Sequence, residues 1–104
     1  MFPALAALLA DFGERLRLAR LRRQFAAATV ATRAGIARAT LARAEHGDPS
    51  VALGTYLRIL RVLGLESDLS LLARDDELGR KLQDLELPIR RRAPRTGAGP
   101  ATGA

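Results

Sequence analysis

The stretch from Val30 to Gly47 constrains the fold of this chain most strongly. It predicts two short helices joined by a sharp turn at Gly35, because glycine reaches positive φ without steric cost. The segment from Ala37 to His46 is rich in alanine and contains no proline or glycine, so it favours a helix. Gly47 follows it as a helix-ending residue. The stretch therefore predicts a helix, a tight turn and a second helix.

The second of these helices has two distinct faces when its residues are placed at about 100° per residue. Leu41 and Ala44 fall on one face, which we expect to be buried. The opposite face carries two arginines and a histidine that are separated only by methyl groups. Its members are Arg38, Ala39, Ala42, Arg43 and His46. A slim helix with arginines on its outer face suits the major groove of DNA, which admits one helix.

Composition bounds the class of protein. A chain of 104 residues is enough for one small domain. Its apolar residues are mostly alanine and leucine, which favours an all-α fold. The absence of cysteine excludes disulfides and thiolate metal sites, and a single histidine excludes histidine-based metal sites and catalytic triads. We therefore expect no metal, no cofactor and no enzymatic activity.

The positive charge is concentrated in two parts of the chain, residues 12–65 and the tail from Arg90, which holds four arginines and no acid. Residues 12–65 hold ten arginines against three acids, a net charge of +7, whereas residues 66–89 have a net charge of −4. This distribution suits a polyanionic partner such as double-stranded DNA. The apolar first ten residues lack the basic start of a signal peptide, and no stretch approaches the ~20 apolar residues of a membrane span. We expect a cytoplasmic protein without a membrane contact.

A longer set of residues extends the pattern along about half of the chain. Its members are Phe12-Gly13-Glu14-Arg15-Leu16, Arg20, Ala31, Ala34-Gly35-Ile36, Arg38, Thr40-Leu41, Arg43, Glu45-His46-Gly47, Pro49-Ser50, Leu57 and Leu63-Gly64-Leu65. On these residues, the segment 12–65 resembles the Cro/CI-type (Xre-like, lambda repressor-like) helix-turn-helix domain. The resemblance implies an all-α domain of five or six helices, a homodimer on a two-fold DNA operator, and a pairing of Arg20 with Glu45.

Two positions depart from the pattern of that family. Ala26 stands where a hydroxyl or amide usually caps the second helix, and Ala27 stands where a glutamine often holds a phosphate. Losing a side-chain cap costs about 1 kcal/mol. The departures keep an alternative open, namely a protein-interaction adaptor without DNA binding.

The second helix of the motif, Ala37 to His46, is the expected recognition helix, and its outer face supplies the candidate base contacts. Arg38 and Arg43 are expected at base edges, since arginine pairs bidentately with guanine, and Ala39 and Ala42 are expected at thymine methyl groups. Other side chains position the protein on the DNA backbone without reading sequence. The candidates for phosphate contacts are Arg33, His46 and Ser50.

Further helices are expected on both sides of this motif. The first runs from Pro3 to about Gln24, with Gly13 tolerated inside it at a cost near 1 kcal/mol. Its first turns, residues 1–11, extend ahead of the domain and serve either the core or a dimer or partner surface. A helix over 27–34 follows. The next helix is capped by Ser50 and ends at Gly64, with an apolar stripe of Leu53, Tyr56, Leu57, Leu60 and Leu63.

Residues 66–89 form an acidic helical extension. Ser67 is expected to cap a short helix that ends at Ala73, and a second helix is expected over 74–87, before Pro88. This second helix carries an apolar seam of Leu78, Leu82 and Leu85. The seam either packs on its own domain or contacts another protein.

The domain and its leucine-bearing extension together resemble antitoxin repressors of the HipB kind. That resemblance implies self-repression of an operon and a HipA-like kinase toxin as partner. A stand-alone Xre-family transcriptional regulator is the alternative. From Arg90 the composition shifts to Arg, Pro, Gly, Ala and Thr, so residues 90–104 are expected to form a disordered basic tail.

Overall fold

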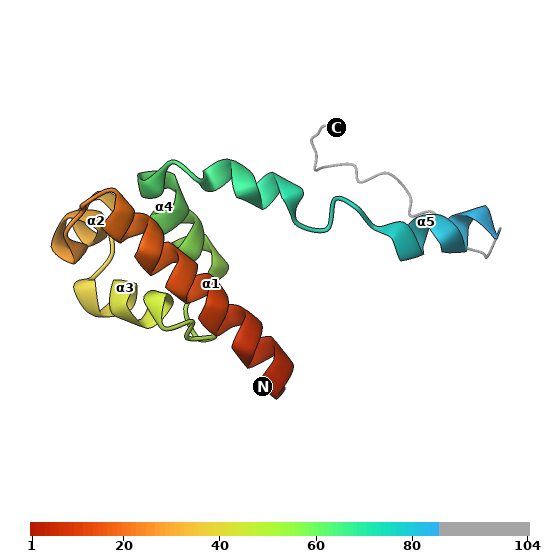
Figure 1. The fold of residues 1–104 in the computed structure, drawn as a ribbon, viewed down its shortest axis with the longest axis horizontal. Coiled ribbons are helices and arrows are strands. Elements are labelled where there is room, and N and C mark those ends of the chain that lie inside the picture. The colour runs from red at the N-terminus through yellow and green to blue at the C-terminus, as the bar shows by residue number, and fades with distance from the viewer. Residues whose placement is uncertain (86–104) are drawn as a thin grey trace, which may run out of the picture. The chain divides into compact units, whose positions relative to one another are not determined.

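A computed structural model describes residues 1–85 of the chain, and these residues form helices and loops with no strand (Figure 1). The elements are α1 (Pro3–Arg22), α2 (Ala27–Ala34), α3 (Arg38–Glu45), α4 (Leu53–Leu63), the 3-10 helix η1 (Glu66–Leu71) and α5 (Glu77–Asp84). The predicted all-α fold is therefore confirmed. The expected tail from Arg90 lies outside the described residues. The chain divides into two compact units, residues 1–72 and the segment from Ala73 onward.

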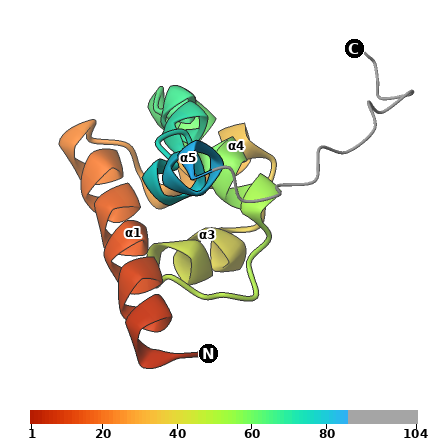
Figure 2. The same ribbon diagram turned by 90° about the vertical axis from the view of Figure 1, so that its right-hand side faces the viewer.

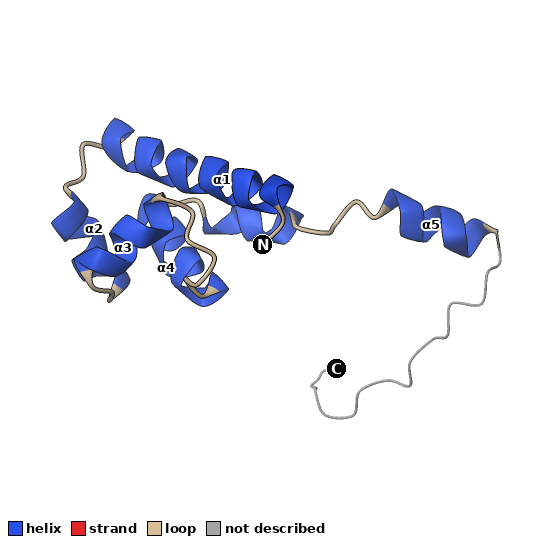
Figure 3. Cartoon of the chain, turned by 90° about the horizontal axis from the view of Figure 1, so that it is seen from below, coloured by secondary structure: helices blue, strands red, loops and turns tan. Residues whose placement is uncertain are grey.

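In the first unit, four helices share one apolar core. Leu16 of α1, Val30 of α2, Leu41 of α3 and Ile59 of α4 are almost completely buried in it. α1 packs on α3, as Figure 2 shows, and also on α4, and α2 packs on the same two helices. Figure 3 shows α1 lying along one side of the other three helices. Helices α1 and α2 therefore hold α3 in place from two sides.

The first four helices end in the same backbone cap. After each helix, two successive N–H groups donate to carbonyl oxygens three and five residues earlier, a pattern typical of the Schellman motif. After α2 these donors are Gly35 (3.1 Å) and Ile36 (3.0 Å), and after α4 they are Gly64 (3.0 Å) and Leu65 (2.8 Å). Ile36 and Leu65 pack against the core. The caps thus turn the chain sharply and return it to the core.

Gly13 lies where α1 crosses the end of α3. A Cβ on Gly13 would lie 2.6 Å from the Ala44 carbonyl oxygen and 2.6 Å from the Gly47 nitrogen. Gly47 has φ +73°, and a Cβ there would lie 2.6 Å from the Cα of Ala10. Gly13 is therefore more than a tolerated helix residue, because only glycine allows the two backbones to approach this closely.

The start of α4 differs from the prediction. α4 begins at Leu53 after Ala52, and the hydroxyl and N–H of Ser50 both donate to the Asp48 carboxylate at 2.8 Å. The predicted Ser50 cap is wrong because α4 begins only at Leu53, with Ala52 at the cap position, while Ser50 donates to Asp48 in a local turn. Leu53 is 64% exposed, and it borders an open hollow of about 560 Å³ rather than the packed core.

The elements after Gly64 also differ from their predicted bounds. η1 is a 3-10 helix that ends at Leu71, and Ser67 lies inside it without capping it. α5 is shorter than predicted because its cap lies at Asp76, whose side chain accepts a hydrogen bond of 2.9 Å from the Gly79 N–H. The expected end at Pro88 lies outside the part of the chain that the structure describes.

Candidate nucleic-acid interface

α3 has one face in the core and the other in solvent. Leu41 and Ala44 are 1% and 0% exposed, so they fix the helix to the domain. The opposite face is accessible along its whole length. Its exposed residues are Arg38, Ala39, Ala42 and Arg43. The helix therefore presents two guanidinium groups with methyl groups between them on a rigid support.

Arg20 ties α1 to the last residue of α3. Its Nε and Nη2 donate to the two carboxylate oxygens of Glu45 at 2.7 and 3.0 Å, and its Nη1 donates to the Phe25 carbonyl oxygen at 3.2 Å. The two side chains are only 13% and 8% exposed. The hydrogen bonding that Arg20 donates to Glu45 raises the pKa of Arg20, against a smaller opposing effect of burial. This bidentate pair fixes the end of α3 and balances the charge of its carboxylate.

The two arginines of the α3 face differ in their surroundings. The Arg43 Nε lies 3.7 Å from an Asp48 carboxylate oxygen, an ion pair between two accessible side chains. Arg38 makes no ion pair within the described residues. Hydrogen bonds from the N–H and hydroxyl of Ser50 lower the pKa of Asp48, and the charge of Arg43 adds to this effect. Asp48 therefore stays ionised beside Arg43 at neutral pH.

The three candidate phosphate contacts lie in different surroundings. His46 follows α3 directly, and its Nδ1 lies 2.7 Å from the Ala42 carbonyl oxygen. With the proton on Nδ1, Nε2 of the neutral ring is an acceptor, so a hydrogen bond to a phosphate oxygen requires protons on both ring nitrogens. Ser50 is exposed, but its hydroxyl proton is engaged by Asp48. The Arg33 guanidinium lies over the Phe25 ring, 5.4 Å from its centre, at a cation–π distance.

The structure groups Arg33 with residues that the sequence analysis did not single out. It lines a hollow with Arg58 and Arg61 of α4, away from the set around Arg38. Arg58 and Arg61 are spaced three apart on a helix, which places them on one face. That spacing was the available signal, but nothing in the sequence connects it to Arg33.

The starts of α2, α3 and α4 have no side-chain caps. The residue at each cap position is an alanine, namely Ala26, Ala37 and Ala52. The first N–H groups of a helix have no acceptor within the helix. These three helix starts therefore leave backbone donors without a side-chain acceptor, as expected for Ala26 from the sequence.

The leucines of the predicted seam lie in the second unit. Leu78 is 68% exposed, Leu82 is half-buried, and Leu85 is 71% exposed and follows the last residue of α5. The helical part of the seam therefore consists of Leu78 and Leu82, four residues apart.

Two helices joined by the glycine turn at Gly35, and held by α1 and α4, define a helix-turn-helix fold. The family model of the helix-turn-helix domain matches residues 11–72, more than half of the chain. The chain belongs to this family. No match is found among curated proteins. DNA-binding helix-turn-helix domains place the second helix of the motif in the major groove, so the family indicates a DNA-binding regulator. Among the residues described, no helix is long and apolar enough to cross a membrane.

Proposed function

We propose that this protein is a sequence-specific transcriptional repressor of the Cro/CI type, which binds its operator as a homodimer. The observation that carries the proposal is the outward face of α3, where Arg38 and Arg43 stand on a helix anchored by Leu41 and Ala44. The net charge of +7 over residues 12–65 favours a polyanion at this face.

Each candidate side chain, on the α3 face or outside it, has a role in this proposal. Arg38 and Arg43 pair with guanine, and Ala39 and Ala42 pack on thymine methyl groups. Arg33, His46 and Ser50 contact phosphates, which set register without reading sequence, and the Ser50 hydroxyl exchanges Asp48 for a phosphate oxygen on binding. Two protomers contact half-sites about one helical turn apart.

Selection of binding sites from random DNA, followed by titration at fixed salt, tests the proposal. Arg38→Ala and Arg43→Ala should each weaken binding to the selected site by ~1–3 kcal/mol and relax the base preference at one position. Arg17→Ala is a matched control, because Arg17 is an exposed arginine on α1 that pairs with Glu14 at 3.1 Å. Equal affinity of both variants and the parent would reject these contacts. A parent that selects no DNA would favour the adaptor without DNA binding.

We also propose that α5 contacts a second protein through Leu78, Leu82 and Leu85. The exposure of Leu78 and Leu85 and the acids around them support a surface that is covered only in a complex. In an antitoxin of the HipB kind the partner is a HipA-like kinase toxin. In a stand-alone Xre-family regulator the partner is the second protomer.

Truncation after Ala73 tests this role of α5. The first unit has its own core, so the truncated protein should stay folded and keep its base preference. It should lose partner binding or part of its dimer affinity, measured by its mass in solution and by co-purification. A truncated protein that unfolds would assign the seam to the core of its own domain. Unchanged mass and unchanged partners would reject the docking role.

A further inference from the structure

Three arginines from two helices line one hollow outside the α3 face. Arg33 of α2 and Arg58 and Arg61 of α4 surround a space of about 520 Å³, together with Ala34 and Val62. No carboxylate lines this space. Within the described residues, none of the three arginines takes part in an ion pair. We call this set the arginine hollow. Glu66 lines a separate hollow with Arg58 and Arg61 but forms no ion pair with either of them.

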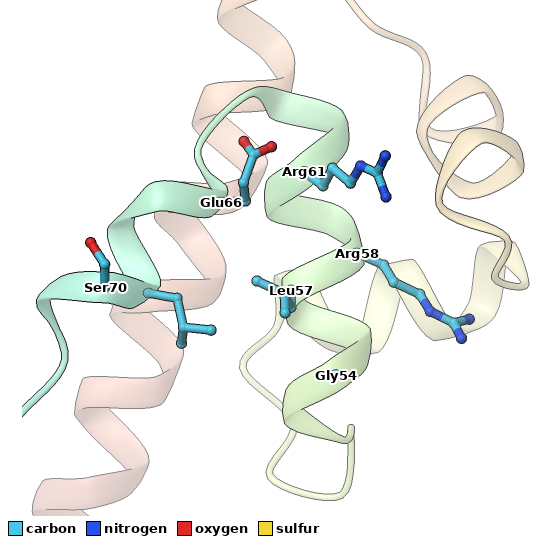
Figure 4. A pocket seen from close by; sticks show the side chains of 7 residues that line it. Gly54, Leu57, Arg58, Arg61, Glu66 and Ser70 are labelled. Carbon is cyan, nitrogen blue, oxygen red and sulfur yellow. The ribbon is translucent and has the colours of Figure 1, made fainter. Parts of the chain in front are cut away.

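Two of the arginines point in a common direction, and the third lines the same hollow. Figure 4 shows Arg58 and Arg61 pointing to one side of α4, while Glu66 and Ser70 lie on the other side. The contact of Arg33 with the Phe25 ring, at 5.4 Å, restricts the third guanidinium. Because α2 packs on α4, the three groups are held on one rigid support.

We propose that the arginine hollow binds the sugar–phosphate backbone of the same DNA duplex whose bases α3 reads, an inference that rests on the proposed function. Guanidinium groups match phosphate oxygens with several fixed donors. The arginine hollow lies at the end of α2. A different hollow, lined by Ala27, Arg38 and Ala39, lies at the start of α2.

The length of α2 makes this placement physically reasonable. Eight residues at a rise of 1.5 Å give about 12 Å. The major groove is about 12 Å wide and is bordered on both sides by phosphates. The two ends of α2 are therefore about one groove width apart, and the end that carries the arginine hollow is assigned to a bordering strand.

A purely structural role would explain part of the cluster. Arg33 and Arg61 lie in the last turns of α2 and α4, where a cation offsets the partial negative charge of a helix end. Arg58 lies earlier in α4 and gains nothing from that effect. Stabilisation of helix ends therefore does not account for Arg58, whereas a phosphate site accounts for all three arginines.

The test is the salt dependence of DNA binding by an Arg58→Gln/Arg61→Gln double variant. The matched control is Arg74→Gln/Arg80→Gln, which removes the same charge from two arginines near Asp75 in the second unit. Affinity for a selected duplex and for an unrelated duplex is measured between about 50 and 200 mM salt. Each lost phosphate contact should reduce the slope of log affinity against log salt by about 0.9.

The double variant should therefore show a slope lower by about 1.8 on both duplexes, with unchanged base preference. Over this fourfold salt range it should lose about tenfold less affinity than the parent. The control variant should keep the parental slope. Arg58→Lys/Arg61→Lys keeps both charges, so this variant should keep most of the parental slope. Arg58→Gln alone should lower the slope by about 0.9 without changing a residue at a helix end.

A parental slope in the Gln variants would overturn the arginine hollow as a DNA site. So would a lowered melting temperature with unchanged slope, because that result assigns the arginines to the helix ends. If the parent binds no duplex, the proposed function fails together with this site. If the parent binds DNA but the Gln variants keep the parental salt slope, the arginine hollow alone fails.

Discussion

Gly13 of α1 lies so close to Gly47 that a Cβ on Gly13 would be 2.6 Å from the Gly47 nitrogen. The same Cβ would lie 2.6 Å from the carbonyl oxygen of Ala44. All of these neighbours are backbone atoms, which cannot move aside as a flexible side chain can. Contact between α1 and the end of α3 thus depends on the absence of one methyl group.

Gly13→Ala should therefore destabilise the protein by about 1–3 kcal/mol, the usual range for overpacking. This is the opposite of the gain of about 1 kcal/mol that alanine brings at an open helix position. Urea unfolding followed by circular dichroism measures the difference.

Gly54→Ala is the matched control, because Gly54 also lies in a helix and a Cβ there meets nothing within 4 Å. This variant should gain up to about 1 kcal/mol. Equal effects of the two substitutions would contradict the close approach of α1 to α3.

Arg20 and Glu45 should be energetically coupled. Glu45→Ala leaves a mostly buried guanidinium without its main partner, and Arg20→Ala leaves a buried carboxylate. In a double-mutant cycle each single variant should be destabilised, and the double variant should lose less than their sum by about 0.5–3 kcal/mol. Strictly additive losses would show that the pair contributes nothing to stability.

Gln24 is a position where substitution by glycine should stabilise the protein. It occupies the cap of α1 at φ +56°, where the equivalent residue after α2 and α4 is a glycine. A left-handed conformation costs a residue with a Cβ roughly 1–2 kcal/mol. Gln24→Gly should raise the free energy of unfolding by about 1 kcal/mol, measured by thermal melts.

The reverse substitution, Gly35→Ala, should lower stability by a similar amount. Its φ is +70° and a Cβ would meet no atom within 4 Å, so the penalty comes from the backbone alone. A Gln24→Gly variant no more stable than the parent would argue against strain at the end of α1.

Asp48 should make the stability of the protein sensitive to acid. Its pKa in the folded state is lowered from an ordinary 3.8, first by the Ser50 N–H and hydroxyl and then by Arg43. The stability it contributes is therefore fully present above that ordinary pKa and is lost as pH falls through the folded value. Melting temperatures from pH 6 to 2.5 should fall more steeply for the parent than for Asp48→Asn.

Asp11→Asn is the control for this comparison, since Asp11 is exposed and has no ion pair or side-chain hydrogen bond among the described residues. Its melting temperatures should follow the parental curve. Parallel curves for Asp48→Asn and the parent would exclude Asp48 as a source of acid sensitivity.

Periodicity and glycine positions were sufficient to predict most of the fold. The buried face of α3 follows from the spacing of Leu41 and Ala44, and two helix ends follow from Gly35 and Gly64. These features depend on neighbours close in sequence. The exposed face of α3 follows from the same periodicity, because it is the side of the helix opposite Leu41 and Ala44.

Features that depend on distant or competing neighbours could not be predicted in this way. Ser50 donates to Asp48 in a local turn, and α4 begins only at Leu53, so the cap position falls on Ala52. The role of Gly13 requires knowing that the end of α3 crosses it. Arg33 joins Arg58 only because α2 packs on α4, and no sequence spacing reports that packing.

The cap after α2 also affects the speed and entropy of binding. The N–H groups of Gly35 and Ile36 are already hydrogen-bonded in the free protein, and Ile36 is already packed on the core. The turn therefore has no freedom left to lose when a partner meets α3, and ordering of loops and side chains is one of the main costs of association. Encounter with DNA should then need no folding step, and differences in affinity between sites should appear mainly in the dissociation rate.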